Sequence, residues 1–323
     1  MAPIPRKKDF VSILDIVADL EGILADAARL KAERWRGTLR PTLRGKNLGL
    51  IFEKPSTRTR TSFEVAIHDL GGHAIYLSSK DLQLGRGETI ADTARVLSRY
   101  CDALAYRAFH HADVVELARW ATIPVINALD DAEHPCQVVA DLLTMRERWK
   151  SRFAGHRLAW VGDGNNVLHS LLLGSATVGL DLTVATPAGY RPQPEVVRAA
   201  QTLARRSGAK IEFTTDPGTA AQGADALYTD VWVSMGDESE QAAREAAFQG
   251  FQVNSELLAR ALPTAFVLHD LPAHRGQEIT DEVLDGPRSA AWDQAENRLH
   301  AQKAILEYLV RPRPARPERG RRR

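Results

Sequence analysis

Apolar residues follow two alternating patterns along this chain. Short apolar runs, typical of β-strands, are followed by longer stretches in which apolar residues recur every three or four positions, as on one face of a helix. This β-α alternation predicts mostly parallel sheets, because successive parallel strands are usually connected by a helix. The predicted strands are residues 47–52, 73–77, 103–106, 124–128, 157–161, 182–185, 210–213, 226–229 and 265–269.

The alternation forms two series, which indicates two domains. The first series ends near residue 150 and the second begins near residue 155, with the charged stretch Arg146–Arg152 between them. A helical pattern over residues 10–34 precedes the first series, and another over residues 292–309 follows the second. A chain of 323 residues, of which 44% are hydrophobic, is long enough to bury both cores.

Composition argues against several classes of protein. The formal net charge is +1, so the body of the chain has no general attraction for nucleic acid or an anionic membrane. No apolar run reaches the length of a membrane span, and Met1–Lys8 is not followed by the apolar core of a secretory signal. Cys101 and Cys136 both lie among apolar residues, so we expect no disulfide framework and a cytoplasmic location. The basic, proline-rich residues 311–323 are expected to form a disordered tail.

Residues 53–64, Glu-Lys-Pro-Ser-Thr-Arg-Thr-Arg-Thr-Ser-Phe-Glu, carry the most informative motif. Hydroxyl and guanidinium side chains alternate from Ser56 to Arg60, directly before a helical pattern that includes Phe63 and Ile67. The N-terminus of a helix offers free N–H groups and a positive dipole end, and arginine matches the geometry of phosphate. The motif therefore predicts a site for a small phosphate compound, and the alternative is a surface helix with solvated arginines. No Gly-x-x-x-x-Gly-Lys-Ser/Thr loop is present, so a nucleoside triphosphate is not expected.

Other polar clusters also follow predicted strands. Parallel α/β sheets bind ligands at the carboxyl ends of their strands, so these clusters are candidate site residues. His134 and Gln137 open a helix around Pro135 and offer hydrogen-bonding groups for a carbonyl compound. The string Val-Gly-Asp-Gly-Asn-Asn (161–166) lacks the third glycine of the dinucleotide fingerprint, which argues against a nicotinamide dehydrogenase. The clusters are Ser56–Arg60, Arg107, His134–Gln137, Asn165–Asn166, Asp230–Gly236 and His269–Pro272.

Five motifs, in this order, resemble those of the aspartate/ornithine carbamoyltransferase family. They are Ser-Thr-Arg-Thr-Arg (56–60), His-Pro-Cys-Gln (134–137), Asp-Gly-Asn-Asn (163–166), Asp-Val-Trp-Val-Ser-Met-Gly (230–236) and His-x-Leu-Pro (269–272). The Ser-Met-Gly segment resembles the ornithine branch of the family. The resemblance implies transfer of the carbamoyl group from carbamoyl phosphate to the δ-amine of L-ornithine, giving L-citrulline and phosphate. Two directions stay open: arginine biosynthesis and the reverse, catabolic direction. It implies no cofactor and no metal.

The resemblance also implies an α/β fold of two doubly wound domains joined by interdomain helices, each with a central, mostly parallel sheet flanked by helices. Residues 1–150 would bind carbamoyl phosphate, and residues 151–290 would bind ornithine. Residues 291–310 would form a C-terminal helix that packs back on the first domain. Gln83 matches a residue that the family lends to the active site of a neighbouring subunit. A homotrimer, or a multiple of trimers, with shared active sites is therefore implied.

Residues implied in carbamoyl phosphate binding combine hydroxyl, guanidinium and amide donors. Arg107 would bridge the phosphate and the carbonyl, and Arg298 would lie near the carbonyl. His134 would polarise the carbonyl, and Gln137 would bind the carbamoyl amide. The phosphate would be held by Ser56, Thr57, Arg58 and Thr59. The positions that match ornithine binding are Asn166, Asp230, Ser234, Met235 and Leu271.

One position departs from the ornithine branch. That branch usually has a cysteine between His and Leu-Pro, whereas this chain has Asp270. An ionised carboxylate would repel phosphate and favour the ammonium form of ornithine, and both effects oppose the reaction. Three interpretations stay open: Asp270 is a general base with a raised pKa, it replaces a supporting contact in a slower enzyme, or it marks a different acceptor amine or a carbamoyl phosphate-binding paralogue of low activity.

Overall fold

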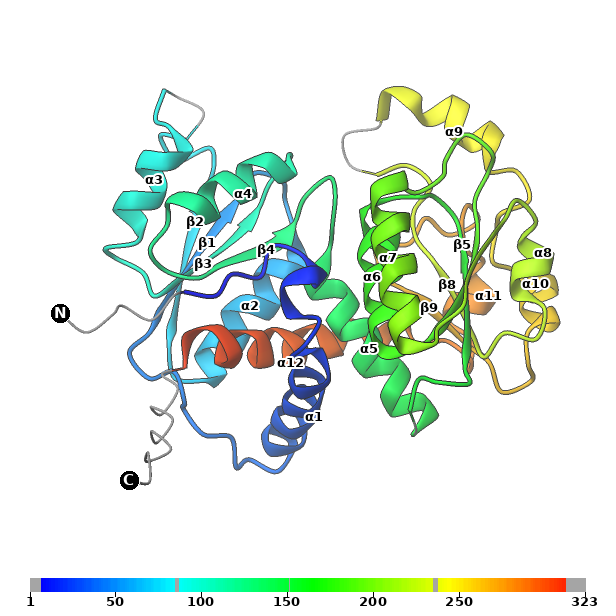
Figure 1. Cartoon of the computed structure of the whole chain (residues 1–323), viewed down its shortest axis with the longest axis horizontal. Coiled ribbons are helices and arrows are strands. Elements are labelled where there is room, and N and C mark those ends of the chain that lie inside the picture. Colours follow the sequence, from blue (N-terminus) through cyan, green and yellow to red (C-terminus); the bar gives the residue numbers. More distant parts are fainter. Residues whose placement is uncertain (1–6, 85–86, 151, 235–237, 312–323) are drawn as a thin grey trace, which may run out of the picture.

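The structure, a computed structural model, describes residues 7–84, 87–150, 152–234 and 238–311. Two lobes lie side by side, and each is built around a parallel sheet flanked by helices (Figure 1). The predicted α/β fold class is therefore confirmed. Met235 and residues 312–323 of the predicted tail lie outside the described residues.

The first lobe holds the strands of the first half of the chain. Its sheet has the order β2-β1-β3-β4, and each neighbouring pair is parallel. Side chains of β1 and β3 are almost entirely buried, as expected for central strands of a sheet that is covered on both faces. The strands are β1 (Asn47–Phe52), β2 (His73–Ser78), β3 (Ala103–Arg107) and β4 (Val125–Leu129). The helices of this half are η1 (Ile13–Ile16), α1 (Leu20–Trp35), α2 (Thr57–Asp69), α3 (Ile90–Leu97) and α4 (His111–Trp120).

The second lobe repeats this architecture with the order β7-β6-β5-β8-β9, again with parallel pairs. The reversal of strand order beside β5 is the kind of switch point at which α/β sheets bind ligands. Its strands are β5 (Arg157–Val161), β6 (Asp181–Ala185), β7 (Ile211–Thr214), β8 (Ala226–Thr229) and β9 (Phe266–His269). Its helices are α6 (Asn166–Val178), α7 (Pro194–Ser207), α8 (Pro217–Ala221), η2 (Glu238–Glu240), α9 (Gln241–Ala247), α10 (Ser255–Arg260) and α11 (Asp281–Leu284).

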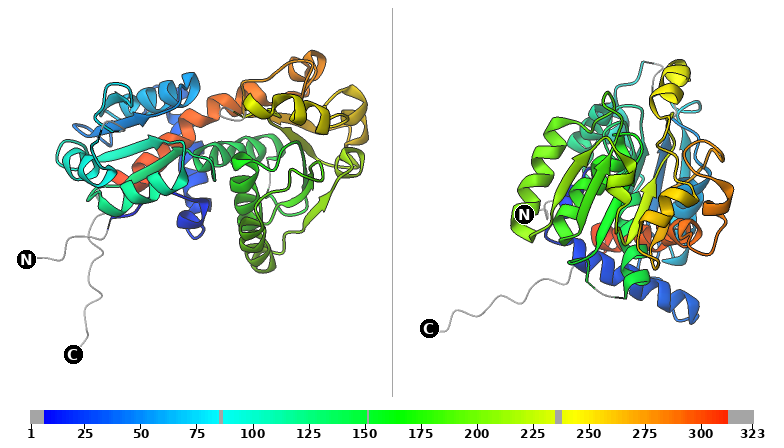
Figure 2. Two further views of the ribbon diagram at one scale, coloured as in Figure 1. Left: turned by 90° about the horizontal axis from the view of Figure 1, so that it is seen from above. Right: turned by 90° about the vertical axis from the view of Figure 1, so that its right-hand side faces the viewer.

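Two long helices connect the lobes. α5 (Pro135–Trp149) leads from the first lobe to the second, and α12 (Ala291–Val310) leads back (Figures 1 and 2). α12 packs against α1, α2 and α5, so the last helix of the chain lies among elements of the first half. Both connecting helices bury polar side chains, which is unusual for helix residues and indicates a role beyond packing. These buried residues include Gln137, Asp141, Gln294, Asn297 and Arg298.

One detail of the predicted secondary structure is wrong. Residues 10–34 do not form one helix, because Ser12 and Asp15 form a capping box around the short helix η1, and α1 begins only at Leu20. The apolar spacing continues across the break because both helices pack into the same core. The helix predicted from His134 to about Lys150 is confirmed as α5, which ends at Trp149, within the charged stretch Arg146–Arg152.

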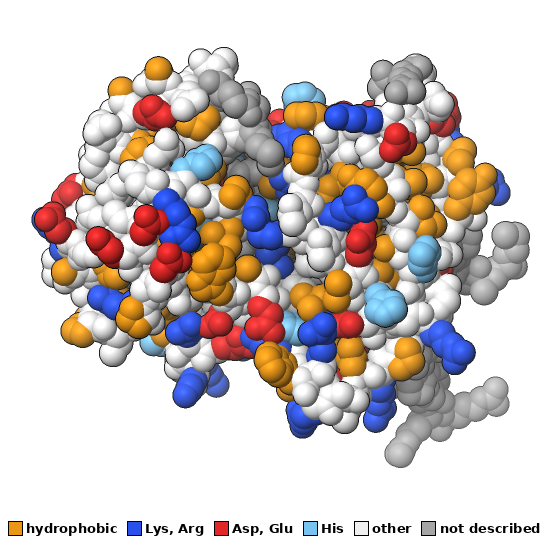
Figure 3. All heavy atoms as spheres, turned by 180° about the vertical axis from the view of Figure 1, so that it is seen from behind, with side chains coloured by type: hydrophobic (Ala, Val, Ile, Leu, Met, Phe, Trp, Pro, Cys, Tyr) orange, Lys and Arg blue, Asp and Glu red, His pale blue; other side chains and the backbone are white. Residues whose placement is uncertain are grey.

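The surface agrees with the balanced composition. Figure 3 shows one face of the molecule, on which acidic, basic and apolar side chains are interspersed. None of the helices in the described ranges has both the length and the apolar character that crossing a membrane requires. Both cysteines, Cys101 and Cys136, are buried and free, as predicted.

Candidate active site

Side chains at the carboxyl ends of strands from both sheets form the candidate site. In the first lobe, Arg107 ends β3 and His134 lies just beyond β4; in the second lobe, Asp230 follows β8 and Asp270 follows β9. Charges of the two lobes interact here. Burial lowers the pKa values of Arg58 and Arg107 in the first lobe, and the charge of Asp270 in the second lobe raises them. The predicted residues at these strand ends are thus brought together, as the ligand-binding rule for parallel sheets requires.

The N-terminus of α2 contributes the hydroxyl and arginine motif. Ser56 caps the helix, and its hydroxyl accepts a hydrogen bond from the Thr59 N–H at 3.2 Å. The two arginines of the motif point to different surroundings. Arg58 is half-buried and interacts with Asp270 and Asp230, whereas Arg60 pairs with Glu64 at 2.9 Å and stacks on a tyrosine ring. Arg58 therefore belongs to the site, and Arg60 does not.

Arg107 is held in place by its neighbours on β3 and at the end of β1. Glu53 accepts hydrogen bonds from the Tyr106 hydroxyl at 2.8 Å and from the Phe109 N–H at 2.7 Å, so it binds residues on both sides of Arg107 in the sequence. Burial lowers the pKa of Arg107 to about 10, and the charges of two other arginines act in the same direction. Arg107 is still a cation at neutral pH, and its environment favours an anion beside it.

Arg298 brings α12 into the same cluster. It is buried, and its guanidinium donates hydrogen bonds to the Thr59 hydroxyl and to the side-chain oxygen of Gln137. Burial lowers the pKa of Arg298, and Asp270 partly offsets this effect. Arg298 thus links three predicted site elements: the start of α2, the start of α5 and the Asp270 loop.

His134 is buried among these cations. Burial and the charges of Arg298, Arg107 and Arg58 lower the pKa of His134 well below its ordinary value. The imidazole is therefore neutral at physiological pH and can donate one hydrogen bond from its ring. Its backbone N–H donates to the Ser170 hydroxyl at 3.0 Å, which fixes the start of α5.

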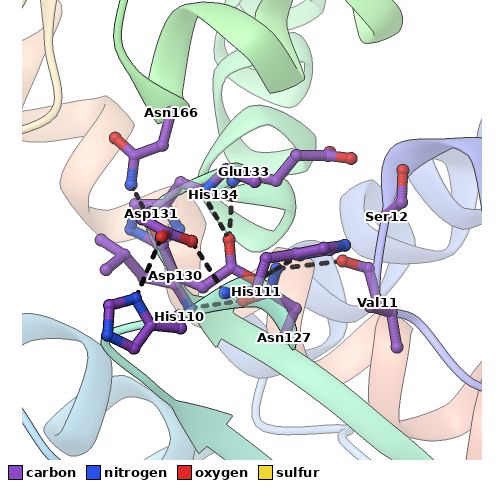
Figure 4. A network of polar contacts seen from close by, with 12 residues as sticks. Val11, Ser12, His110, His111, Asn127, Asp130, Asp131, Glu133, His134 and Asn166 are labelled. Carbon is purple, nitrogen blue, oxygen red and sulfur yellow. Dashed lines mark hydrogen bonds and ion pairs between the residues drawn. The ribbon is translucent and has the colours of Figure 1, made fainter. Parts of the chain in front are cut away.

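The loop before His134 is ordered by Asp130 (Figure 4). The buried Asp130 carboxylate accepts from Asn127 Nδ2 at 2.7 Å and from two N–H groups of its own loop, and it pairs with His111 Nδ1 at 2.6 Å. Asn166, at the start of α6, donates from Nδ2 to the Asp130 carbonyl at 2.6 Å. This contact joins a predicted ornithine-binding residue of the second lobe to the loop that carries His134.

Two carboxylates of the second lobe form the other end of the site. Asp230 accepts from Asn165 Nδ2 at 2.7 Å and from the Val231 N–H at 2.7 Å. Asp270 is nine-tenths buried. Burial raises the pKa of Asp270 well above its ordinary value, and the charge of Asp230 and a hydrogen bond between the two carboxyl groups raise it further. The surroundings of Asp270 therefore disfavour its ionised form, which is the form that would repel phosphate.

These carboxylates do not form a ready metal site. Asp230, His269 and Asp270 each offer a ligand atom within 4.8 Å of the others. Both ring nitrogens of His269 are already used, however: Nδ1 accepts from the Leu271 N–H at 2.9 Å, and Nε2 pairs with Glu278 at 3.0 Å. The two carboxyl groups can pair with an ammonium group, and the three guanidinium groups beside them can pair with an anion. A pair of ligands with these opposite charges therefore fits the site better than a metal ion does.

Several buried polar atoms of the site have no hydrogen-bond partner among the described residues. They are Nε of Arg107, Nδ1 of His134, Oδ1 of Asp270 and Nε of Arg298. A buried polar atom without a partner costs about 1–3 kcal/mol, so four of them in one cluster indicate that a polar ligand binds there.

The remaining predicted residues lie at less enclosed positions. Gln83 is exposed, on the segment between β2 and α3. Ser234 is partly exposed and is the last described residue before the gap that contains Met235. Leu271 is partly buried, packs against the core of the second lobe and has a φ of 62°.

Comparison with known proteins agrees with this geometry. Residues 8–147 match the family model described as "Aspartate/ornithine carbamoyltransferase, carbamoyl-P binding domain". Residues 154–309 match "Aspartate/ornithine carbamoyltransferase, Asp/Orn binding domain". This chain belongs to the aspartate/ornithine carbamoyltransferase family.

Individual relatives within this carbamoyltransferase family are similar over nearly the whole chain. The ornithine carbamoyltransferase of Methanoculleus marisnigri is 58% identical over 94% of this chain and 97% of the relative. The catabolic ornithine carbamoyltransferase of Thermoplasma volcanium is 53% identical over 94% of this chain and 99% of the relative. The solved ornithine carbamoyltransferase of Pyrococcus furiosus superposes with a TM-score of 0.91 at 51% identity, covering 94% of this chain and 97% of that one.

Some residues of this carbamoyltransferase site were missed by reasoning from the sequence. Asp130 orders the His134 loop, but it lies in a polar loop where many residues are polar. Asp141, Tyr228 and Gln294 form a buried hydrogen-bonded group beneath Gln137. The one available signal was Asp141, a charged residue within the otherwise apolar run Val-Val-Ala-Asp-Leu-Leu (138–143).

Proposed function

We propose that this chain transfers the carbamoyl group from carbamoyl phosphate to the δ-amine of L-ornithine, giving L-citrulline and phosphate. The observation that supports this most strongly is the division of one site into a cationic end and an acidic end. Three arginines and a neutral histidine lie at one end, and two carboxyl groups lie at the other. A dianionic phosphate compound fits the first end, and a substrate with ammonium groups fits the second.

At the cationic end, the residues hold and polarise carbamoyl phosphate. The phosphate binds the N-terminus of α2 through Ser56, Thr57, Arg58 and Thr59, and Arg107 bridges it to the carbonyl. Neutral His134 and the buried Arg298 stabilise the negative charge that develops on the carbonyl oxygen. Phosphate is already a good leaving group, so the chemistry needs positioning and charge stabilisation and no cofactor or metal.

At the acidic end, the residues bind ornithine and remove a proton. Asp230 pairs with the α-ammonium group, and Asn166, Ser234, Met235 and Leu271 complete the ornithine subsite. An alkyl amine has a pKa near ~10.4 and must lose a proton before its nitrogen can attack. Asp270 accepts this proton as a general base, for which a strongly raised pKa is suited. The α-ammonium beside Asp230 favours the ionised form of Asp270. Binding of ornithine therefore favours the form of Asp270 that can accept a proton.

The assembly we propose is a homotrimer, or a multiple of trimers, in the cytoplasm. Gln83 would complete the site of a neighbouring subunit, which is compatible with its exposed position away from the core. Light scattering should give three times the protomer mass of 35.6 kDa or a multiple of it. Mixing Gln83→Ala with His134→Ala subunits should restore activity, because hybrid trimers contain sites with both native residues. A monomeric mass, or no restoration after exchange, would contradict shared sites.

The reaction is tested by measuring citrulline directly. Purified protein is incubated with ¹³C-labelled carbamoyl phosphate and ornithine, and separately with aspartate, putrescine or an acylated ornithine. Citrulline should form with ornithine, and the other amines should give little product. If ornithine gives no product and another amine is carbamoylated, that amine is the acceptor. Asp270 would then be a residue that determines the choice of acceptor amine. We propose a role in arginine biosynthesis, and the ratio of forward to reverse rates tests this direction.

A further inference from the structure

A fully buried carboxylate lies directly beneath the carbamoyl end of the site. Asp141 is on α5, one turn after Gln137, and none of its surface is exposed. Its Oδ1 accepts from Gln137 Nε2 at 2.7 Å and from Gln294 Nε2 at 2.7 Å. Its Oδ2 accepts from the Tyr228 hydroxyl at 2.9 Å. Asp141 therefore receives donors from three elements: α5 itself, α12 and β8.

These contacts leave Gln137 a single orientation. A side-chain amide has a donating and an accepting end, and a flip exchanges the two. The donating end faces Asp141, and the oxygen faces Arg298, whose guanidinium can only donate. A flipped amide would bring its NH₂ group against the guanidinium and its oxygen against the carboxylate. Both contacts would then be repulsive.

The orientation matters for what Gln137 can recognise. The carbonyl oxygen of an amide has two lone pairs, and Arg298 uses one of them. The second is free to accept from an NH₂ group, which carbamoyl phosphate has and acetyl phosphate lacks. The two compounds have nearly the same shape, so this contact is a direct way to tell them apart. A site that hydrogen-bonds an N–H group discriminates strongly against an analogue without it.

We propose that Asp141 is a specificity-determining, positioning residue: by fixing the amide of Gln137, it makes the site select a carbamoyl over an acetyl group. Asp141 does not touch the substrate and acts only through Gln137. This inference rests on the proposed function, because it assumes that carbamoyl phosphate binds at the start of α2. It extends that function in two respects: the site recognises the NH₂ group of carbamoyl phosphate, and the buried Asp141 makes this recognition possible.

The test compares carbamoyl phosphate, acetyl phosphate and inorganic phosphate as ligands of the native protein and of Asp141→Leu. The binding preference for carbamoyl over acetyl phosphate should fall by roughly tenfold or more in the Leu variant, as for loss of one hydrogen bond in a buried site. The affinity for inorganic phosphate should change by less than about twofold, since phosphate does not reach Gln137. A general structural defect would weaken all three ligands together, and that outcome would overturn the proposal.

Asp141→Asn is the matched control and remains informative if the Leu variant does not fold. Its oxygen can still accept from Gln137 and Gln294, while its NH₂ group donates to Tyr228, whose hydroxyl can reverse from donor to acceptor. Asp141→Asn should therefore keep the native preference for carbamoyl phosphate, and loss of that preference would contradict the proposed geometry. Failure of the proposed function itself looks different, because the native protein would then show no preference and form no citrulline.

Discussion

At one end of the site burial lowers the pKa values of Arg58, Arg107 and Arg298, and the charge of Arg58 lowers those of Arg107 and Arg298 further. At the other end burial and the charge of Asp230 raise the pKa of Asp270. The arginines still remain cations, since even Arg107 keeps a pKa of about 10. At Asp270 the surroundings favour the neutral form instead, and a cationic substrate that binds beside it favours the ionised form. The cationic end therefore provides a constant positive charge for binding, while the acidic end carries the titration that catalysis needs.

The largest effect is expected from Arg58→Ala at the cationic end. Loss of a guanidinium that makes several charge-assisted contacts should lower kcat/KM by roughly 10³-fold or more, which is about 4 kcal/mol. Inorganic phosphate should also bind much more weakly. Arg60→Ala is the control from the same motif, because Arg60 pairs with Glu64 outside the site. Near-native turnover of Arg58→Ala would remove residues 56–59 from the phosphate site.

Asp141, the buried carboxyl group beneath the carbamoyl end of the site, should make stability depend on pH. Burial raises the pKa of Asp141 from 3.8 to about 7, so the folded chain retains a proton that the unfolded chain loses above about pH 4. Asp141 should therefore make the folded state less stable as the pH rises from about 4 to about 7, by up to about 4 kcal/mol. Urea unfolding of native protein and Asp141→Asn at equal protomer concentration measures the difference. Parallel pH dependence of the two proteins would contradict the raised pKa.

Asp230→Asn should affect the two ends of the site differently, with a larger effect on ornithine binding than on carbamoyl phosphate binding. Ornithine should bind about 10- to 100-fold more weakly, as for loss of a hydrogen bond between charged groups, because its α-ammonium loses its partner. The KM for carbamoyl phosphate should stay within about twofold, since Asp230 lies at the opposite end. The pKa of Asp270 should fall because the neighbouring negative charge is gone, so the rise of kcat/KM with pH should move to lower pH. An equal loss for both substrates would show that the ends are not independent.

The smallest effect is expected from removing residues 311–323. Residues 312–323 lie outside the described residues, and none of the predicted site residues is in the removed segment. Citrulline formation by the shortened chain should match that of the full chain. A large loss of activity or of assembly would give this basic segment a role that its sequence does not indicate.

The fold and the cationic end could be predicted from the sequence because each rests on local patterns. Strands and helices alternate with clear apolar spacing, and Ser56–Thr59 and His134 open helices directly after strands. The predicted helix over residues 10–34 was wrong because capping by Ser12 interrupts a chain whose apolar spacing continues. Arg298 entered only through the family resemblance, since nothing in the local pattern of α12 distinguishes it from a surface arginine.

The buried polar residues could not be predicted, because their meaning comes from contacts distant in sequence. Asp141 bonds Tyr228 and Gln294, which follow it by 87 and 153 positions. Asn166 was named as an ornithine-binding residue, and its contact with the carbonyl of Asp130 could be found only in three dimensions. The state of Asp270 was likewise open in the sequence, since its raised pKa depends on burial and on Asp230.

The most direct test of the account is citrulline formation from about pH 6 to about pH 10 by the native chain and by Asp270→Cys. If Asp270 is the general base, native kcat/KM rises with pH as the carboxyl group ionises, and the cysteine variant is slower by roughly a hundredfold. The cysteine variant should also lose that rise, since its thiol ionises at a different pH. A nearly inactive native chain that is rescued by Asp270→Cys would contradict the account, because Asp270 would then be an obstacle to the reaction.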